Sequence, residues 1–317
     1  MMKKVAVLTS GGDAPGMNSV IHAICLRCAN LNIEPVGVIG GFKGLYEGHF
    51  VKLHSDKTSQ SASMGGTILK SSRFIEFKQA KYVEAAAQKA REAGIDGIIV
   101  IGGDGSYLGA LALSKAGMPT IGVPGTIDND ISGTQFTIGF DSAFNTIVHC
   151  IDQLKDTIRS HERCLLVEVM GRHCSDLAVY GAISGNVDAV ITAETKIDEM
   201  ALKDLVIDSI KRKDECMIMI SENVLNVHEL AARLEKLSGI ECRGSVLGYL
   251  QRGGNPSARD RLLAARCGLY AVDALNDGHS GECTCLKDEM IVLLPIEKAL
   301  SENYHNSYIH EEYQKLR

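Results

Sequence analysis

The chain has 317 residues, of which 45% are apolar and 23% are charged, and its formal net charge is −6. This composition is typical of a globular protein, and the length favours one large domain or two medium ones. The acidic balance disfavours a general nucleic-acid or membrane-surface binder, although local basic clusters could still bind small anions.

Short apolar runs alternate with longer segments of helical periodicity. The runs predicted as strands begin at Val5, Glu34, Gly97, Pro119, Arg163, Asp188, Cys216, Ser245 and Met290. The predicted helices are roughly Met17–Asn30, Gln79–Ala93, Ser106–Ala116, Asp141–Ser160, Ala201–Arg212, Val227–Leu237 and Ser257–Leu275. This order predicts an α/β fold with mostly parallel sheets and right-handed crossovers. Such folds bind ligands beyond the carboxyl ends of their strands.

Ten cysteines are scattered along the chain, which is typical of a reduced cytosolic protein rather than a disulfide scaffold. Neither Cys25 with Cys28 nor Cys283 with Cys285 has a further ligand at metal-site spacing, so we expect no disulfide and no structural zinc. The apolar run after the N-terminal lysines is too short for a signal peptide, and no stretch approaches a membrane span. We therefore expect a cytoplasmic protein.

A first glycine-rich loop, TSGGDAPGMN, follows the first predicted strand and leads into a helix. Its glycines leave backbone amides uncovered at the positive end of a helix, which suits an anion, although purely structural glycines explain the turn equally well. The loop matches neither GxGxxG nor a Walker A motif.

Two further loops after strands carry carboxylates. In IGGDGSYLG, Asp104 is either a helix N-cap or a ligand of Mg²⁺, which prefers one or two carboxylates plus phosphate oxygens. In PGTIDND, Asp128 and Asp130 either solvate a turn or do chemistry. We expect the three loops to converge on one crevice, which packing alone explains poorly.

Basic residues near strand ends complete the pattern. Any single arginine could be an ordinary surface residue, but five at such places favour phosphate binding. They are Arg73, Arg163, Arg172, Arg243 and Arg252, with Glu222 at a further strand end.

In their order and spacing, TSGGDAPGMN, IGGDGS, PGTIDND, VEVMGR and LGYLQRGGNP closely resemble bacterial ATP-dependent 6-phosphofructokinases, over essentially the whole chain. The resemblance implies two Rossmann-like lobes with the active site in the crevice between them. Residues 1–138 plus 252–300 would form the ATP-binding lobe, and 139–251 plus 301–317 the sugar-phosphate lobe. It also implies a homotetramer with active sites shared between subunits, and transfer of the ATP γ-phosphoryl group to O1 of fructose 6-phosphate.

The resemblance also implies roles for individual residues. Asp128 matches the general base, which chemistry supports because an alcohol is a poor nucleophile. Asp104 matches the Mg²⁺ ligand, and Asp130 would assist through water. The positions that match ATP contacts are Gly12, Arg73, Phe74, Gly103, Gly105 and Ser106. The positions that match sugar-phosphate contacts are Thr126, Met170, Gly171, Arg172 and Glu222, with Arg163 and Arg243 from a neighbouring subunit and Arg252 forming the 6-phosphate clamp.

Several positions bear on donor and sugar choice. Relatives that use pyrophosphate typically carry Asp at the position of Gly105 and Lys at that of Gly125, so the two glycines favour ATP. Tyr249 stands where the family usually has His near the sugar 6-phosphate, and it lacks the positive charge of a protonated histidine. Lys70 replaces a common Gly and is expected to point outward.

The positions that match the family's effector pocket depart further. His22, Leu26, Ser55 and Lys155 stand where arginines are usual, while Lys211, Arg212 and Lys213 keep some basic character and Asp188 matches an acidic position. We expect weakened or altered control by ADP and phosphoenolpyruvate.

Other functions stay open at this point. A kinase acting on tagatose 6-phosphate or sedoheptulose 7-phosphate, or a non-catalytic regulatory paralogue, would share most of these motifs. NAD and lipid kinases share the GGDG turn but not PGTIDND or QRGG. A dehydrogenase is disfavoured because the GxGxxG motif is missing.

Overall fold

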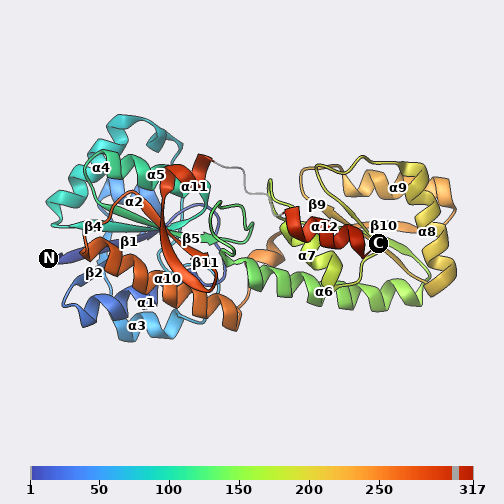
Figure 1. Cartoon of the computed structure of the whole chain (residues 1–317), viewed down its shortest axis with the longest axis horizontal. Coiled ribbons are helices and arrows are strands. Elements are labelled where there is room, and N and C mark those ends of the chain that lie inside the picture. Colours follow the sequence, from blue (N-terminus) through green and yellow to red (C-terminus); the bar gives the residue numbers. More distant parts are fainter. Residues whose placement is uncertain (1, 302–306, 317) are drawn as a thin grey trace. The chain divides into compact units, whose positions relative to one another are not determined.

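The computed structural model describes residues 2–301 and 307–316 of the chain. The described chain forms two compact units (Figure 1). The first unit holds the chain up to Ser142 and the segment that begins at Arg252, and the second holds Ala143–Gln251 and the C-terminal helix. The return crossing that the sequence predicts near residue 300 adjoins residues 302–306, which lie outside the described residues.

The first unit is built on a mostly parallel sheet of eight strands. Its order is β12-β11-β5-β4-β1-β2-β3, with β6 beside β5; β3 and β12 run antiparallel to their neighbours. The strands are β1 (Lys4–Thr9), β2 (Glu34–Val38), β3 (Phe50–Lys52), β4 (Gly97–Gly102), β5 (Thr120–Thr126), β6 (Ile138–Gly139), β11 (Glu282–Lys287) and β12 (Met290–Pro295). The central strands β1, β4 and β5 are apolar and buried almost throughout, as strands covered on both faces should be.

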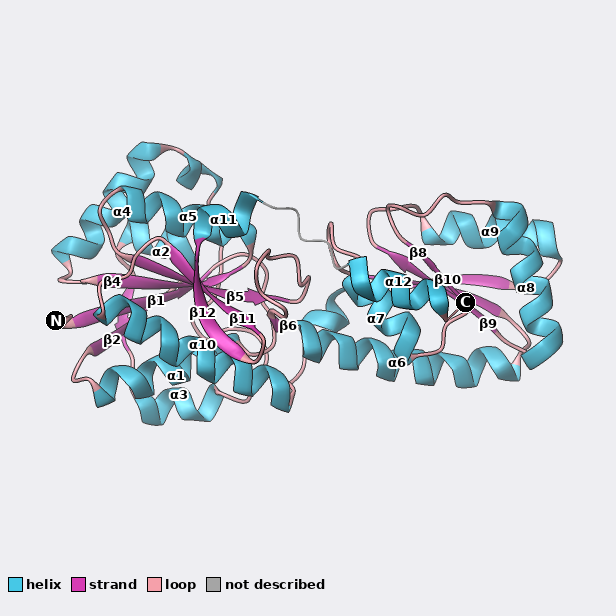
Figure 2. Ribbon diagram, in the orientation of Figure 1, coloured by secondary structure: helices cyan, strands magenta, loops and turns pink. Residues whose placement is uncertain are grey.

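Helices cover both faces of this sheet (Figure 2). One face carries α2 (Gly41–Glu47), α4 (Ala80–Glu92), α5 (Asp104–Lys115) and α11 (Ile296–Ser301), and the other carries α1 (Met17–Asn30), α3 (Ser55–Ser61) and α10 (Ala258–Asn276). A short 3₁₀ helix, η1 (Ile75–Lys78), precedes α4. The β–α order places the loops after β1, β4 and β5 at one edge of the sheet, which is where open α/β folds bind ligands.

The second unit has a smaller parallel sheet in the order β10-β7-β9-β8. Its strands are β7 (Cys164–Val169), β8 (Ala189–Ile191), β9 (Cys216–Ser221) and β10 (Cys242–Val246). Helices α8 (Glu199–Lys213) and α9 (Val227–Ser238) cover one face, while α6 (Phe140–Ser160) and α7 (Asp176–Ser184) cover the other, with α12 (Ser307–Lys315) against α7. The 3₁₀ turn η2 (Gly248–Arg252) follows β10.

The α/β fold with mostly parallel sheets is confirmed, and the prediction of a helix over Met17–Asn30 matches α1. The strand predicted from Ser245 is wrong, because β10 ends at Val246 and the chain then turns. Gly248 has φ +51, a left-handed conformation that interrupts an extended strand and opens η2. Within residues 2–301 and 307–316, no helix is long and apolar enough to span a membrane.

Candidate functional site

Three loops of the first unit meet at the carboxyl ends of β1, β4 and β5. A Cβ at Gly11, after β1, would lie 3.5 Å from the Oγ of Ser106 in α5, and one at Gly103 would lie 3.6 Å from Thr126 at the end of β5. The structure thus brings the glycine-rich loop, the GGDG turn and the PGTIDND loop together, as the sequence predicts.

At this edge, close packing requires Gly102 and leaves little room at Gly12. A Cβ at Gly102 would lie 2.3 Å from the Oγ of Ser106 and 2.6 Å from the carbonyl oxygen of Ser10. A Cβ at Gly12 would lie 3.0 Å from the guanidinium of Arg252. Any side chain at position 12 would therefore displace that guanidinium. Arg252 contributes its positive charge to the glycine-rich loop of the first unit.

Asp104 is the first residue of α5, so its carboxylate sits at the positive end of a helix. Gly105 beside it is exposed, and a Cβ there would meet nothing within 4 Å. Among the described residues, no group of three or more His, Cys, Asp or Glu side chains could hold a metal ion unaided. A single carboxylate in an open, amide-rich turn fits Mg²⁺ that takes its other ligands from phosphate oxygens and water.

The PGTIDND loop is fixed by Asn129, whose role the sequence analysis missed. Asn129 is buried at φ +54, a conformation that Asn adopts more readily than most residues, and its Oδ1 accepts a hydrogen bond from the Thr137 amide at 2.9 Å. The Oγ1 of Thr126 accepts from the Asp128 amide at 3.2 Å. These bonds fix Asn129 and the backbone beside it, and the partly buried side chains of Asp128 and Asp130 flank it.

The segment that carries Arg73 lies against the glycine-rich loop. The hydroxyl of Ser71 donates to the Gly11 carbonyl at 2.7 Å, and the amide of Ile68 donates to Asn18 Oδ1 at 2.8 Å. Arg73 itself is exposed beside these contacts. Its neighbour Phe74 packs among Tyr46, Phe77 and Tyr82 in the aromatic cluster of this unit. Lys70 has φ +59, which explains a common Gly there, and its side chain is exposed, as expected.

In the second unit, the turn after β7 is held by side chains from other strands. Oε1 of Glu222, which follows β9, accepts hydrogen bonds from the amides of Gly171 at 3.1 Å and Arg172 at 2.6 Å. Oε1 of the buried Gln251 accepts from the Met170 amide at 3.0 Å. The sequence analysis quoted Gln251 only within QRGG and gave it no role. The three residues that match sugar contacts therefore form a fixed turn, and Glu222 shapes it.

Tyr249 stands in η2, which the Nε2 of Gln251 ties down by donating to the Gly248 carbonyl at 3.0 Å. Its side chain is 79% exposed, so the phenol is presented on the surface of the second unit rather than packed in its core.

Arg163 and Arg243 lie together at the opposite end of the second sheet. Arg163 precedes β7, and its Nε contacts Glu241 at 2.7 Å; an Nη of Arg243, near the start of β10, contacts the other oxygen of Glu241 at 2.5 Å. Both arginines therefore lie at the amino edge of the sheet, whereas Arg172 and Glu222 lie at its carboxyl edge. A six-residue strand separates these edges by roughly 17–20 Å.

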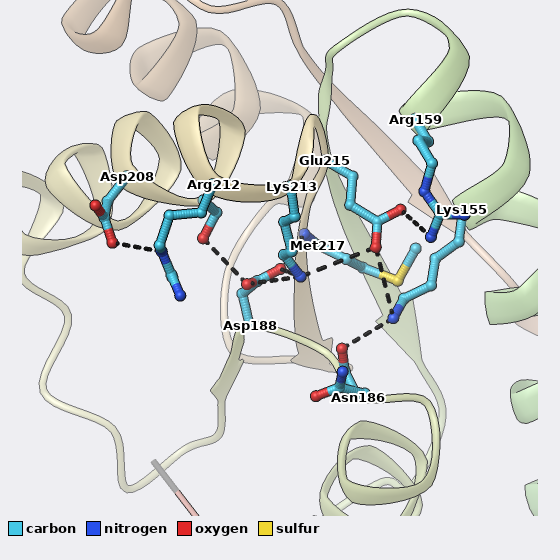
Figure 3. Close-up of polar contacts among 10 residues, drawn as sticks. Lys155, Arg159, Asn186, Asp188, Asp208, Arg212, Lys213, Glu215 and Met217 are labelled. Atoms are coloured by element: carbon cyan, nitrogen blue, oxygen red, sulfur yellow. Dashed lines mark hydrogen bonds and ion pairs between the residues drawn. The ribbon is translucent and has the colours of Figure 1, made fainter.

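The predicted effector positions of the second unit form an ion-pair cluster around two buried carboxylates (Figure 3). Glu215 is only 5% exposed and contacts Arg159 at 3.0 Å and the Nζ atoms of Lys155 and Lys213 at 3.9 Å each. Asp188 contacts Lys213 at 3.0 Å. The sequence analysis missed Glu215 and Arg159, because only the fold brings them to Lys155.

The remaining bonds of this cluster fix its geometry. Asp188 also accepts hydrogen bonds from the Ser209 hydroxyl at 3.0 Å and from the Met217 amide at 2.9 Å. The Nζ of Lys155 donates to the Asn186 carbonyl at 2.9 Å, and burial lowers the pKa of this lysine. Lys211 is exposed, and Arg212 contacts Asp208.

The other effector positions belong to the first unit. His22 in α1 shares a hydrogen bond of 3.0 Å with Thr58 in α3, and burial lowers the pKa of its imidazole. Leu26 is exposed on the same helix, and Ser55 begins α3. The predicted effector positions are thus divided between the two units, and neither unit contains them all.

A buried acid that the sequence analysis did not single out joins α6 to α10. Oδ2 of Asp260 accepts hydrogen bonds from the Ser142 amide at 2.8 Å and the Ser142 hydroxyl at 2.6 Å. Burial raises the pKa of this carboxyl to about 6, against the opposing effect of these hydrogen bonds. Asp260 therefore titrates within a pH range in which the folded protein can be studied.

Together these features define an α/β protein in which three loops meet at one sheet edge, two of them bearing carboxylates. The family described as phosphofructokinase matches residues 4–275. The ATP-dependent 6-phosphofructokinase of Vibrio parahaemolyticus serotype O3:K6 is 47% identical over 293 residues, 92% of each chain. ATP-dependent 6-phosphofructokinase 1 of Clostridium perfringens is 45% identical over 300 residues, 94% of each chain. The chain belongs to the phosphofructokinase family.

A solved structure agrees with this membership. Phosphofructokinase from Saccharomyces cerevisiae superposes with a TM-score of 0.85 at 29% identity. The match covers 94% of this chain and 45% of the yeast chain, so this chain spans less than half the length of that relative.

Proposed function

We propose that this protein transfers the γ-phosphoryl group of ATP to O1 of fructose 6-phosphate, giving fructose 1,6-bisphosphate. The observation that carries the proposal is the meeting of three loops at one sheet edge, with Asp104 in a turn open to phosphate and Asp128 held by a fixed loop. The first unit would then be the ATP-binding lobe and the second the sugar-phosphate lobe.

In this mechanism Asp128 is the general base. Its carboxylate accepts the proton of the sugar O1 hydroxyl as that oxygen attacks the γ-phosphorus, and Asp130 assists through water. The bonds that Asn129 and Thr126 make to the loop keep this carboxylate in place without rearrangement. A positioned base is needed because the unaided alcohol is a poor nucleophile.

Asp104 would hold Mg²⁺ together with the phosphate oxygens of ATP. When bound, the metal neutralises charge on the phosphates as the leaving oxygen departs. The amides of Gly12, Gly103, Gly105 and Ser106 would surround the phosphates, and Arg73 would add positive charge. Arg252, which we assign to the 6-phosphate clamp, lies with its guanidinium against Gly12. Phe74 supports this segment from the aromatic cluster.

Met170, Gly171 and Arg172 would hold the sugar, with Arg172 also contacting the transferring phosphoryl group. Glu222 accepts two amide hydrogen bonds from this turn, so we propose that it orients the turn as well as contacting sugar hydroxyls.

The 6-phosphate would bind arginines from a second copy of the chain. Arg163 and Arg243 lie at the amino edge of the sheet that carries Arg172 at its carboxyl edge, roughly 17–20 Å away, which is too far for one fructose phosphate. A homo-oligomer, proposed here as a tetramer, solves this by sharing sites between subunits. Glu241, which now joins the two arginines, would give way to phosphate.

The donor is ATP rather than pyrophosphate. The Cβ direction of Gly105 opens into free space, which leaves room for the α-phosphate of a nucleotide. The glycine at position 125 is explained by packing instead. A Cβ there would lie 2.8 Å from Ile101 and 3.3 Å from Met17, so packing alone demands Gly. Of the two glycines, only Gly105 bears directly on the donor.

Control by ADP and phosphoenolpyruvate should be weak. The cations Lys155, Arg159 and Lys213 are already paired with Glu215 and Asp188, so an anionic effector must compete with two buried internal carboxylates. A strongly sigmoidal response to phosphoenolpyruvate that ADP relieves would contradict this part of the proposal.

A second candidate substrate rests on Tyr249. Its exposed phenol lacks the charge of a protonated histidine near the expected 6-phosphate, which favours testing tagatose 6-phosphate and sedoheptulose 7-phosphate beside fructose 6-phosphate. We also propose that the protein acts in the cytoplasm, where its ten cysteines, all free, stay reduced.

The direct test measures sugar bisphosphate from each of these sugars with MgATP and, separately, with Mg-pyrophosphate. We expect the highest kcat/KM with fructose 6-phosphate and MgATP. A preference for another sugar would move the proposal to that substrate, and turnover with pyrophosphate alone would overturn the donor assignment.

A further inference from the structure

Three cysteines lie side by side at the amino end of the second sheet. Cys164 begins β7 and is the register partner of Cys242 on β10 and of Cys216 on β9. All three are buried in the core on the face that α8 and α9 cover. Side chains of register partners on parallel strands point to the same face, so the thiols form a row with Cys164 in the middle.

The spacing of the strands decides which thiols can join. Neighbouring strands lie about 4.8 Å apart, within the range of roughly 4.4–6.8 Å between Cα atoms that a disulfide spans. Cys216 and Cys242 are two strands apart, about 9.6 Å by the same spacing, which is too far. Cys164 can therefore pair with either neighbour, whereas the two outer cysteines cannot pair with each other.

Cys164 and Cys242 differ from each other. Hydrogen bonding to Cys216 and Cys242 raises the pKa of Cys164, and the hydrogen bond with Cys164 lowers the pKa of Cys242 against the opposing effect of burial. Cys242 also lies on β10, the edge strand of this sheet, whereas β7, which carries Cys164, is paired on both sides. Because the thiolate is the reactive form, the edge position and lowered pKa of Cys242 favour it over Cys164 as the site of first attack.

We propose that Cys164 and Cys242 form an oxidisable dithiol that a hydroperoxide converts into a disulfide between β7 and β10, with Cys216 as the alternative partner of Cys164. The Cys242 thiolate attacks the peroxide, which is reduced to an alcohol, or to water for hydrogen peroxide, and Cys242 becomes a sulfenic acid. The Cys164 thiol then attacks that sulfur, an S–S bond forms, the S–O bond breaks and water leaves. Two thiols lose two electrons in total, and the peroxide gains them.

Peptide mapping tests the pairing, because trypsin places the three cysteines in separate peptides, Cys164–Arg172, Asp214–Arg233 and Leu237–Arg243. The full-length native protein is treated with hydrogen peroxide, denatured with iodoacetamide present and digested without reductant. We expect the peptide of Cys164 linked to that of Cys242. The amount of alkylated, unlinked Cys164 peptide should fall by about half or more. Dithiothreitol should remove the link.

Single substitutions test the central place of Cys164. In Cys242→Ser the link should move to the peptide of Cys216, and in Cys164→Ser both links should vanish. Cys25→Ser removes a buried thiol of α1 and should leave the link unchanged.

Three results would overturn the proposal. The first is a wild-type protein whose Cys164 peptide stays unlinked, and the second is a Cys216–Cys242 link in Cys164→Ser. The third is a disulfide between Cys283 and Cys285, whose sulfur atoms lie 3.8 Å apart, in place of the predicted one. If Cys164→Ser does not fold, the disulfide expected between Cys164 and Cys216 in Cys242→Ser still tests the proposal.

Discussion

At the scale of single residues, the structure separates glycines that packing demands from glycines that leave room for a ligand. Gly102 and Gly125 would clash with neighbouring atoms if they carried a Cβ, whereas Gly105 faces open space. The sequence shows only that all three are glycine. Whether a glycine serves packing or binding depends on tertiary neighbours, which no local pattern contains.

Gly105→Asp therefore offers a clean test of donor choice. A Cβ at this position meets no other atom within 4 Å, so the fold should persist, but the carboxylate would repel the phosphates of ATP. We expect kcat/KM for MgATP to fall by about 10²-fold, equivalent to ~2.7 kcal/mol, with any pyrophosphate activity reduced less. Equal loss with both donors, in protein whose circular dichroism is unchanged, would count against this role.

The raised pKa of Asp260 leads us to expect that the stability of the fold depends on pH. Its pKa is about 6 in the folded protein, whereas an unfolded Asp titrates near 3.9, so between these values the folded state holds more protons. The free energy of unfolding should therefore fall by up to ~3 kcal/mol as the pH rises from about 4 to about 6. Urea unfolding of the wild type and of Asp260→Asn across this range measures it. The variant should lack this decline, and parallel curves for both proteins would refute the assignment.

At the scale of elements, long periodic segments were predictable and short or interrupted ones were not. The apolar spacing of α1 and the runs of β1, β4 and β9 carry strong local signals. The two-residue β6 and three-residue β3 carry almost none, and the strand predicted from Ser245 was misplaced by the turn at Gly248. These elements depend on pairing with strands that are distant in sequence.

The positioning roles of Gln251 and Glu222 escaped prediction for the same reason, although Glu222 itself was predicted as a sugar contact. Gln251 acts on the amide of Met170, and Glu222 acts on the amides of Gly171 and Arg172, across 50 residues or more. Motif spacing located the turn and its glycine. It could not show that Gln251 and Glu222 hold the turn in place.

The loop after β5 can be tested with a matched pair of substitutions. Asn129→Gly keeps access to the left-handed conformation and loses the hydrogen bond to Thr137, whereas Asn129→Ala loses both. We expect Asn129→Gly to cost ~1 kcal/mol of unfolding free energy and Asn129→Ala ~2–3 kcal/mol. Activity should fall in the same order, because the loop carries Asp128. Equal stability of the two variants in urea unfolding would show that the backbone conformation carries no cost.

At the scale of the whole molecule, we propose that one chain cannot complete its own site, because the residues assigned to the sugar phosphate lie at two opposite edges of the second sheet. Arg172 and Glu222 belong to the carboxyl edge, and Arg163 and Arg243 belong to the amino edge. The family resemblance predicts shared sites, and the positions of these residues in the sheet support that proposal.

Mixing two inactive variants tests this sharing. Asp128→Asn lacks the base and Arg243→Ser lacks part of the phosphate clamp, but a hybrid oligomer can combine the intact Asp128 of one chain with the intact Arg243 of another. After coexpression, or after dissociation and reassociation, an equal mixture should regain up to about a quarter of the wild-type sites. Assays at a fructose 6-phosphate concentration where neither variant turns over alone provide the control. No recovery in verified hybrids would place both residues in one chain's site.

The most direct test of the central claim is the kinetics of Asp128→Asn with MgATP and fructose 6-phosphate. A positioned base contributes about 10²–10⁴-fold to rate, so kcat should fall by that factor while KM for both substrates changes little. Undiminished unfolding stability and nucleotide binding would show that the fold and the ATP-binding lobe are intact. A variant that keeps kcat within a few-fold of wild type would contradict the assignment of Asp128 as the base.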